Sequence, residues 1–161
     1  MSEAHVFERS QPVRQKIKRP HAMGVVMDAY GRVLTGIYGS GNGKKGQRGL
    51  PGGGIDEGES PVDAIVRETF EETGLAIKVL PQYVWQFACA DKHLQAHIGI
   101  ARVCGQFFPL DTPEMHTFQW HRIERLLQLE LSPRSRQGLE LVRFKVQHIA
   151  EAMPYPQPRT A

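Results

Sequence analysis

The chain has 161 residues, of which 40% are hydrophobic and 23% are charged, a composition typical of one folded domain rather than of a disordered chain. It has no uninterrupted apolar run near the ~20 residues that a membrane-spanning helix needs, and its first residues lack the apolar core of a secretory signal. The two cysteines, Cys89 and Cys104, lie in apolar stretches, which is typical of reduced, buried thiols in a cytoplasmic protein.

Charge is distributed unevenly along the chain. Residues 1–19 hold five basic and two acidic side chains, a balance that equals the formal net charge of +3 of the whole chain. We interpret this arm as a flexible leader before one domain at residues 20–153, with a disordered tail at 154–161. Nucleic-acid contact through the arm is the less favoured interpretation. Residues 51–75 have the opposite sign, with seven acids against Arg67 alone, and a bound cation would explain so acidic a segment.

Apolar patterns, glycines and prolines predict the order of the secondary structure. The expected elements are two strands within 21–39 around a turn at 29–31, a glycine-rich loop at 39–49, a short strand and an acidic loop at 50–60, a helix at 61–73, strands within 75–108 with a turn at 90–92, and a helix from Pro133 to about Ile149. This mixture of strands and helices predicts an α/β (α+β) fold.

Both ends of the helix at 61–73 are marked by the sequence. Ser60 suits the N-cap, Pro61 the first helical position and Asp63 the third, which together form a variant of the capping box. Gly74 can end the helix in a left-handed backbone conformation, which costs glycine little.

Placed at 100° per residue, this helix has two unlike sides. A mostly apolar stripe is expected to face the core, and it consists of Val62, Ile65, Val66, Thr69, Phe70 and Thr73. The other side gathers Glu68, Glu71 and Glu72, because spacings of three and four place side chains on one face. These three carboxylates repel one another. The face is therefore either solvated or a site for a hard divalent cation such as Mg²⁺, which prefers oxygen ligands.

The same segment resembles a known motif. The matching residues are Gly53-x5-Glu59-x7-Arg67-Glu68-x-x-Glu71-Glu72-x-Gly74-Leu75, similar to the Nudix box G-x5-E-x7-R-E-U-x-E-E-x-G-U. Thr69 departs from it, because the family prefers an aliphatic residue there, and this bears on packing more than on chemistry. The resemblance implies a Nudix-like α/β/α sandwich around a mixed β-sheet. It also implies hydrolysis of a phosphoanhydride bond in a nucleoside diphosphate linked to another moiety.

The resemblance assigns roles residue by residue. The implied metal ligands are Glu68, Glu71, Glu72 and the backbone carbonyl of Gly52, holding Mg²⁺ with Mn²⁺ as a substitute. Arg67 would brace the acids through ion pairs, and Glu59 would support the edge of the site. Such a cluster of acids and metal ions suffices for phosphoryl transfer, because positioning and electrostatics carry most of that reaction.

Two further groups outside the motif are candidates for the site. Either Glu68 or an acid elsewhere would handle the attacking water, and we rank Glu114 before Asp91 and Asp111. Basic side chains in the glycine-rich loop could bind substrate phosphates or simply be solvated, and these are Lys44, Lys45 and Arg48.

Few features of the sequence indicate which nucleotide is the substrate. The short chain and the loop before Leu50-Pro51-Gly52-Gly53 resemble MutT-like (d)NTP pyrophosphohydrolases best. An ADP-ribose or nucleotide-sugar pyrophosphatase is the alternative enzyme, and a non-catalytic Nudix-fold nucleotide sensor is the alternative of another class. We expect a nucleotide substrate and no membrane partner, and a homodimer stays open.

Overall fold

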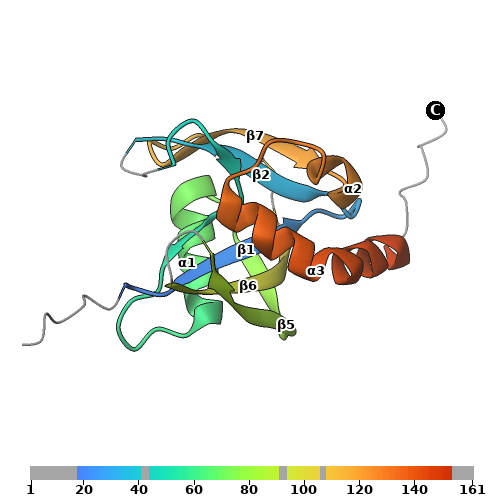
Figure 1. The fold of residues 1–161 in the computed structure, drawn as a ribbon. Helices are drawn as coiled ribbons and strands as arrows, with labels where there is room; N and C mark the ends of the chain where they lie inside the picture. The colour runs from blue at the N-terminus through green and yellow to red at the C-terminus, as the bar shows by residue number, and fades with distance from the viewer. Residues whose placement is uncertain (1–17, 41–43, 91–93, 106–107, 154–161) are drawn as a thin grey trace, which may run out of the picture.

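A computed structural model describes residues 18–40, 44–90, 94–105 and 108–153. Within them, a seven-stranded sheet carries two long helices and one short one (Figure 1). The elements are β1 (His21–Met27), β2 (Val33–Tyr38), β3 (Arg48–Gly49), β4 (Gly52–Gly54), α1 (Pro61–Thr73), β5 (Ile77–Cys89), β6 (Leu94–Val103), β7 (Met115–His121), α2 (Ile123–Leu126) and α3 (Pro133–Ala152). The expected elements are present, although α3 continues past Ile149 and most of the turn expected at 90–92 lies outside the described residues.

The sheet is mixed. Its strand order is β3-β2-β1-β6-β5, with β4 paired to β1 and β7 paired to β2. β1 and β6 run parallel, from His21 opposite Ala96 to Met27 opposite Arg102, and the other pairs are antiparallel. On its other edge β1 pairs first with β4 and only at Met27 with β2, so β2 and β7 diverge from the rest of the sheet (Figure 1).

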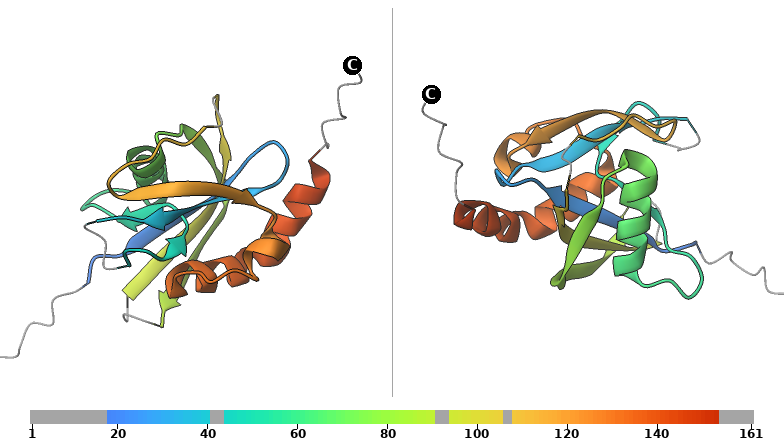
Figure 2. Two further views of the ribbon diagram at one scale, coloured as in Figure 1. Left: turned by 90° about the horizontal axis from the view of Figure 1, so that it is seen from above. Right: turned by 180° about the vertical axis from the view of Figure 1, so that it is seen from behind.

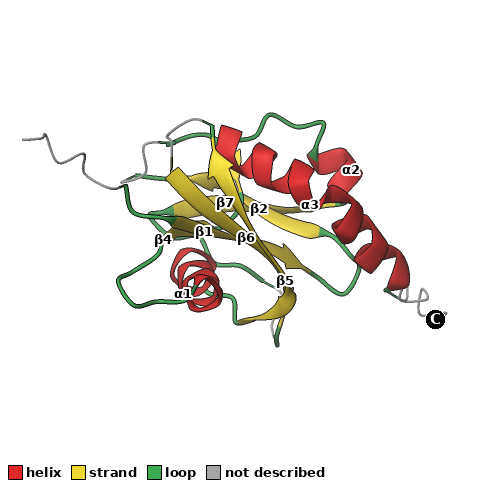
Figure 3. Cartoon of the chain, turned by 60° about the horizontal axis from the view of Figure 1, so that its bottom comes forward, coloured by secondary structure: helices red, strands yellow, loops and turns green. Residues whose placement is uncertain are grey.

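Helices cover both faces of this sheet. Figures 2 and 3 show α1 on one face and α3 on the other. Side chains alternate along a strand, so β1 supplies both interfaces. Met23 and Val25 belong to the apolar cluster under α3, whereas Ala22 and Val26 belong to the cluster under α1. The α/β/α sandwich predicted from the sequence is therefore confirmed.

Helix α1 begins and ends where its sequence predicts. The Ser60 hydroxyl accepts a hydrogen bond from the backbone N–H of Asp63 (3.1 Å), and Pro61 is the first helical residue. Gly74 has a φ of 72° and donates its N–H to the carbonyl of Phe70. The caps therefore fix the length of the helix independently of what it packs against.

The rotation of α1 about its axis differs from the expectation. Val66 and Phe70 are 37% and 60% exposed, whereas Glu68 and Glu72 are only 8% and 3% exposed. Glu71 alone of the three glutamates points outward. The reason is that α1 packs over β4, whose glycines have no side chains and leave room for carboxylates. Glu68 and Glu72 therefore face the sheet, whereas Glu71 faces the solvent.

Thr69, the departure from the motif, is packed in the core on the α1 side. It is fully buried, and its hydroxyl has no hydrogen-bond partner among the described residues. Gly24 of β1 makes this close approach possible, because a Cβ there would lie 3.3 Å from Oγ1 of Thr69. A buried hydroxyl without a partner lowers stability.

We expect Thr69→Val to raise the free energy of unfolding by about 1–3 kcal/mol, because valine keeps the shape and removes the unsatisfied polar atom. Urea unfolding measures the change. Thr73→Val is the matched control and should destabilise the protein, since the Thr73 hydroxyl donates to the Thr69 carbonyl (2.6 Å) and accepts from the N–H of Leu75 (3.1 Å). Equal effects of the two substitutions would contradict the prediction.

Two expectations from composition can be compared with the fold. Cys89 is buried, but the expectation for Cys104 is wrong: it is exposed, because it follows the end of β6 and leaves the sheet. Among the described helices, none combines the length and apolar character needed to cross a bilayer.

Candidate active site

The glycines of β4 bring the backbone very close to its neighbours. β4 pairs with β1, and a Cβ on Gly52 would lie 2.3 Å from the carbonyl oxygen of Ala22. A Cβ on Gly53 would lie 2.5 Å from the carboxylate of Glu68. Because real atoms cannot approach so closely, only glycine lets the acids of α1 reach this strand.

We expect Gly53→Ala to lower turnover by about 10- to 100-fold while changing the free energy of unfolding by less than about 1 kcal/mol. The new methyl group would collide with the end of a flexible side chain, so Glu68 can move aside but loses its position in the site. Measuring turnover and urea unfolding on the same preparation tests both the expected loss of activity and the expected retention of stability. Wild-type turnover would show that the position of Glu68 is unimportant.

Glu68 and Glu72 are buried carboxyls with raised pKa values. Glu72 accepts a hydrogen bond from the backbone N–H of Gly52 (2.8 Å), yet its burial raises its pKa to about 8. Glu68 is ion-paired with Arg67 (2.7 Å), and burial still raises its pKa above the ordinary value. Two neighbouring carboxyls in this state favour either a bound proton or a bound cation.

Without metal, the protein should lose stability as the pH rises. The folded state keeps a proton on Glu72 to about pH 8, whereas the unfolded chain releases it near 4.5. The free energy of unfolding should therefore fall across this window, by at most about 1.4 kcal/mol per pH unit for one proton.

Urea unfolding in EDTA between about pH 5 and pH 9 measures this slope. Comparison with Glu72→Gln cancels the opposite contributions of His97 and His121, whose pKa values burial lowers. A difference between the two proteins that does not change with pH would contradict the prediction.

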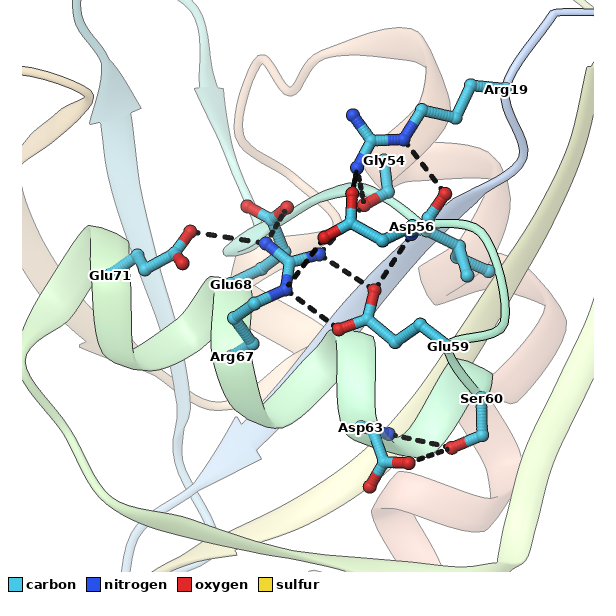
Figure 4. Close-up of polar contacts among 10 residues, drawn as sticks. Arg19, Gly54, Asp56, Glu59, Ser60, Asp63, Arg67, Glu68 and Glu71 are labelled. Carbon is cyan, nitrogen blue, oxygen red and sulfur yellow. Dashed lines mark hydrogen bonds and ion pairs between the residues drawn. The ribbon is translucent and has the colours of Figure 1, made fainter.

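Arg67 is the centre of an ion-pair network along α1 (Figure 4). Its guanidinium contacts Glu59 through Nε and Nη2 (2.7 and 2.9 Å). Through Nη1 it contacts Glu68 (2.7 Å) and Glu71 (3.2 Å), and through Nη2 it donates to the carbonyl of Gly54 (3.0 Å). The paired arginine lowers the pKa of Glu59 to about 2, and the acids raise the pKa of Arg67 further. Arg67 thus offsets part of the negative charge of these acids and holds their side chains in place.

Arg19 contacts the loop that follows β4, from the side opposite Arg67. The charge pattern places it in the N-terminal arm, but its guanidinium donates to the carbonyls of Ile55 (2.8 Å) and Gly54 (3.0 Å) and pairs with Asp56. Figure 4 shows Arg19 and Arg67 on either side of this loop. The backbone that follows β4 is therefore fixed by two arginines.

A cavity of about 480 Å³ lies beside β4 and carries charges of both signs. Its acidic side chains are those of Glu68, Glu72 and Glu114, and its basic side chains are those of Arg19, Lys44 and Arg134. The three glycines of β4 form another part of its wall. The arrangement suits a small polyanion bound together with a cation.

The fold gathers some of the residues selected from the sequence and not others. Those that line the cavity are Lys44, Gly52, Glu68, Glu72 and Glu114. Glu59, Arg67 and Glu71 connect to it through the ion-pair network. Arg48 instead directs its guanidinium to the Thr35 hydroxyl (3.1 Å), and Lys45 is exposed outside the cavity wall.

The other candidates for the general base are placed differently from Glu114. The Asp111 carboxylate accepts a hydrogen bond from the backbone N–H of Thr117 (3.1 Å) and is not among the residues that line this cavity. Asp91 lies outside the described residues, as do residues 1–17 of the arm and the expected tail.

The donors at this site fit a hard divalent cation. The carboxylates of α1 and the Gly52 carbonyl are all oxygen donors, and the missing side chain at Gly53 leaves the space that Glu68 occupies. As the described residues stand, no three acidic, His or Cys side chains share one point. Glu68 and Glu71 are turned to Arg67, and Glu72 to the Gly52 N–H. Binding an ion would exchange these partners for the cation.

The contribution of α3 and of the start of β1 to the cavity was not predicted from the sequence. Arg134, in the first turn of α3, and His21 both line the cavity, with Nη1 of Arg134 2.5 Å from Nδ1 of His21. No motif marks either residue. The helix start at Ser132-Pro133 predicts the helix but not what its first turn faces.

Comparison with known proteins gives a family match over most of the chain. Residues 17–142 match the NUDIX domain family. Over 34 residues the chain is 59% identical to an RNA pyrophosphohydrolase of Bartonella quintana (strain Toulouse), a match that covers 20% of this chain and 20% of that protein. The alignment therefore spans about a fifth of the relative's length.

Solved structures share the fold. An Ap4A hydrolase of C. elegans, in a binary complex, has a TM-score of 0.64 at 15% identity, covering 80% of this chain and 98% of that one. The NUDIX domain of Shewanella oneidensis NrtR, complexed with ADP ribose, has a TM-score of 0.61 at 21% identity, covering 91% and 99%. At these identities the likeness concerns the fold alone.

Proposed function

We propose that this chain, which belongs to the NUDIX domain family, hydrolyses a phosphoanhydride bond in a nucleoside diphosphate linked to another group. Within that class we prefer a nucleoside 5′-triphosphate, cleaved by water to the monophosphate and pyrophosphate. Support comes from the box acids, which include two buried carboxyls, Glu68 and Glu72, at one charged cavity.

The observation that carries the preference for a triphosphate is the presence of both acidic and basic side chains around one cavity. Three basic side chains line the same cavity as three acidic ones. A triphosphate has enough negative charge to bind a cation at the acids and the basic groups at once. In ADP-ribose or a nucleotide sugar, the group beyond the two phosphates is a neutral sugar. A neutral sugar would interact less strongly with these basic side chains.

The residues of the chain would divide the chemistry as follows. Glu68, Glu71, Glu72 and the Gly52 carbonyl would hold Mg²⁺ or Mn²⁺, which when bound neutralises charge on phosphate oxygens and lowers the pKa of a water molecule. Glu114 would accept the proton of the attacking water, with Glu68 as the alternative. Arg67 would position Glu59 and Glu68 without touching the substrate, and Lys44 would attract phosphates.

The Bartonella relative is named an RNA pyrophosphohydrolase, so RNA is a further candidate substrate, and an RNA can carry a triphosphate at its 5′ end. ADP-ribose or a nucleotide sugar remains the alternative substrate of the enzyme. A non-catalytic nucleotide sensor remains the alternative of another class, although retention of every acid of the box disfavours it. Cytoplasmic location and a homodimer remain predictions.

A substrate panel with Mg²⁺ tests the proposal. It contains nucleoside triphosphates, a 5′-triphosphorylated RNA, ADP-ribose, a nucleotide sugar and a dinucleoside polyphosphate, with phosphate, pyrophosphate and nucleotide products measured. Pyrophosphate from triphosphates is the expected result, and AMP with ribose phosphate would favour the alternative enzyme. Nucleotide binding without any hydrolysis would favour the sensor.

A further inference from the structure

Buried hydrogen bonds fasten the first turn of α3 to the chain segment before β4. The Leu50 N–H donates to Oγ of Ser135 (3.0 Å), and the Leu50 carbonyl accepts from the Tyr38 hydroxyl (2.7 Å). The hydroxyl of Ser132 donates to that of Ser135 (2.9 Å), and all four residues are buried. Arg134 therefore projects from a backbone that is fixed relative to the glycine strand.

The Arg134 side chain is buried in the wall of the same cavity as the glutamates. It is 6% exposed, and its Nη1 lies 2.5 Å from Nδ1 of His21, which must act as the acceptor because a guanidinium only donates. A guanidinium carries five N–H donors in a planar fork, so it can hold His21 and a phosphate oxygen together. Burial raises the pKa of the Tyr38 phenol to about 12, and the positive charge of Arg134 acts against this rise.

Two features of the cavity and one general property of arginine argue for an anionic ligand at Arg134. The cavity is small enough, at about 480 Å³, for one ligand to contact both acidic and basic side chains that line it. Arginine binds phosphate through two parallel hydrogen bonds, which gives geometric selectivity as well as attraction. The guanidinium is held by buried packing rather than reaching in from solvent, so little side-chain entropy is lost when it binds.

We propose that Arg134, oriented by His21, binds a substrate phosphate beyond the bond that is cleaved, and so selects triphosphates over substrates that end in a neutral group. The inference rests on the proposed function and deepens it, because it assigns the choice of substrate to a residue outside the Nudix box. Arg134 contacts substrate in this assignment, whereas His21 is a positioning residue.

Kinetics of Arg134→Met test the assignment. We expect KM for the nucleoside triphosphate to rise roughly 10- to 100-fold while kcat changes less than about 3-fold, because the contact forms in the ground state as well as in the transition state. The KM of Arg134→Lys should lie between the values of the wild type and of Arg134→Met, because lysine keeps the charge but lacks the forked donors. Arg143→Met, an exposed arginine on the same helix, is the matched control and should behave as wild type. An unchanged KM in folded Arg134→Met would overturn the proposal.

Binding of inorganic triphosphate in EDTA separates this inference from the proposed function. Isothermal titration calorimetry should show binding to the wild type and to Arg143→Met, and at least about 10-fold weaker binding to Arg134→Met. A protein that hydrolyses no nucleotide but still shows this difference would refute the proposed function and support the anion site. Equal affinities, or no binding to the wild type, would overturn the anion site whatever the enzyme hydrolyses.

Thermal unfolding of each variant shows whether it is folded. If Arg134→Met does not fold, Arg134→Lys carries both measurements, with an expected loss of about 3- to 10-fold in affinity. Wild-type affinity in folded Arg134→Lys, together with an unchanged KM, would then overturn the assignment.

Discussion

Glu71→Gln and Glu72→Gln should each lower turnover by about 100- to 10,000-fold, because losing a metal ligand removes several kcal/mol of transition-state stabilisation. The metal-free protein should stay as stable as wild type or become slightly more stable. At position 72 the amide oxygen of glutamine can still accept the hydrogen bond from the Gly52 N–H. At position 71 the side chain is half exposed, so its ion pair with Arg67 contributes little.

The shift in melting temperature on adding Mg²⁺ gives a second measurement. A ligand stabilises a protein only by binding its native state, so a variant that binds Mg²⁺ weakly should show a smaller shift. Glu140→Gln is the control, because Glu140 is an exposed acid of α3 paired with Arg136. Wild-type turnover together with the full Mg²⁺ shift in both box variants would show that the metal assignment is wrong.

Arg67→Met should lower turnover by about 10- to 100-fold and raise the Mg²⁺ concentration needed for half-maximal activity, as is typical of residues that orient metal ligands. The substitution leaves Glu59 and Glu68 without the guanidinium that now holds them, so both should move or bind protons. Stability should fall as well. Arg67→Lys should recover only part of the loss, because an ammonium cannot reproduce the forked contacts with several acids.

Comparison with Arg32→Met distinguishes a positioning role from simple destabilisation. Arg32 pairs with the buried Asp28 (2.7 Å) in the turn between β1 and β2, so its loss should also destabilise the protein. Only the Arg67 variant should change the Mg²⁺ dependence, with KM for the nucleotide nearly constant. The same Mg²⁺ dependence in both variants would count against positioning by Arg67.

The sequence by itself determined the features that depend on neighbouring residues. Ser60, Pro61 and Gly74 delimit α1 because caps act through backbone groups a few residues away. The order of strands and helices follows from local patterns, and the spacing of the box acids identifies the family. These properties need no knowledge of how distant segments pack.

Tertiary structure decided which way those features face and what meets them. Helical spacing places Glu68 and Glu72 near each other, but only packing over the glycines of β4 turns them inward and buries them. Helical periodicity places them opposite the apolar residues, Phe70 among them, which were expected to mark the buried face. Close backbone approach buried Glu68 and Glu72 together with part of the apolar stripe, and left Phe70 exposed.

The residues that share the cavity with these acids also depend on the fold. Arg134 and His21 are far apart in the sequence, yet pairing of β1 with β4 and docking of α3 on the same segment bring both to the cavity. The sequence determined the acids and the helix that carries them, because both are local properties. The basic side chains that share the cavity with those acids are brought there by contacts between distant segments, and only the tertiary structure decided this.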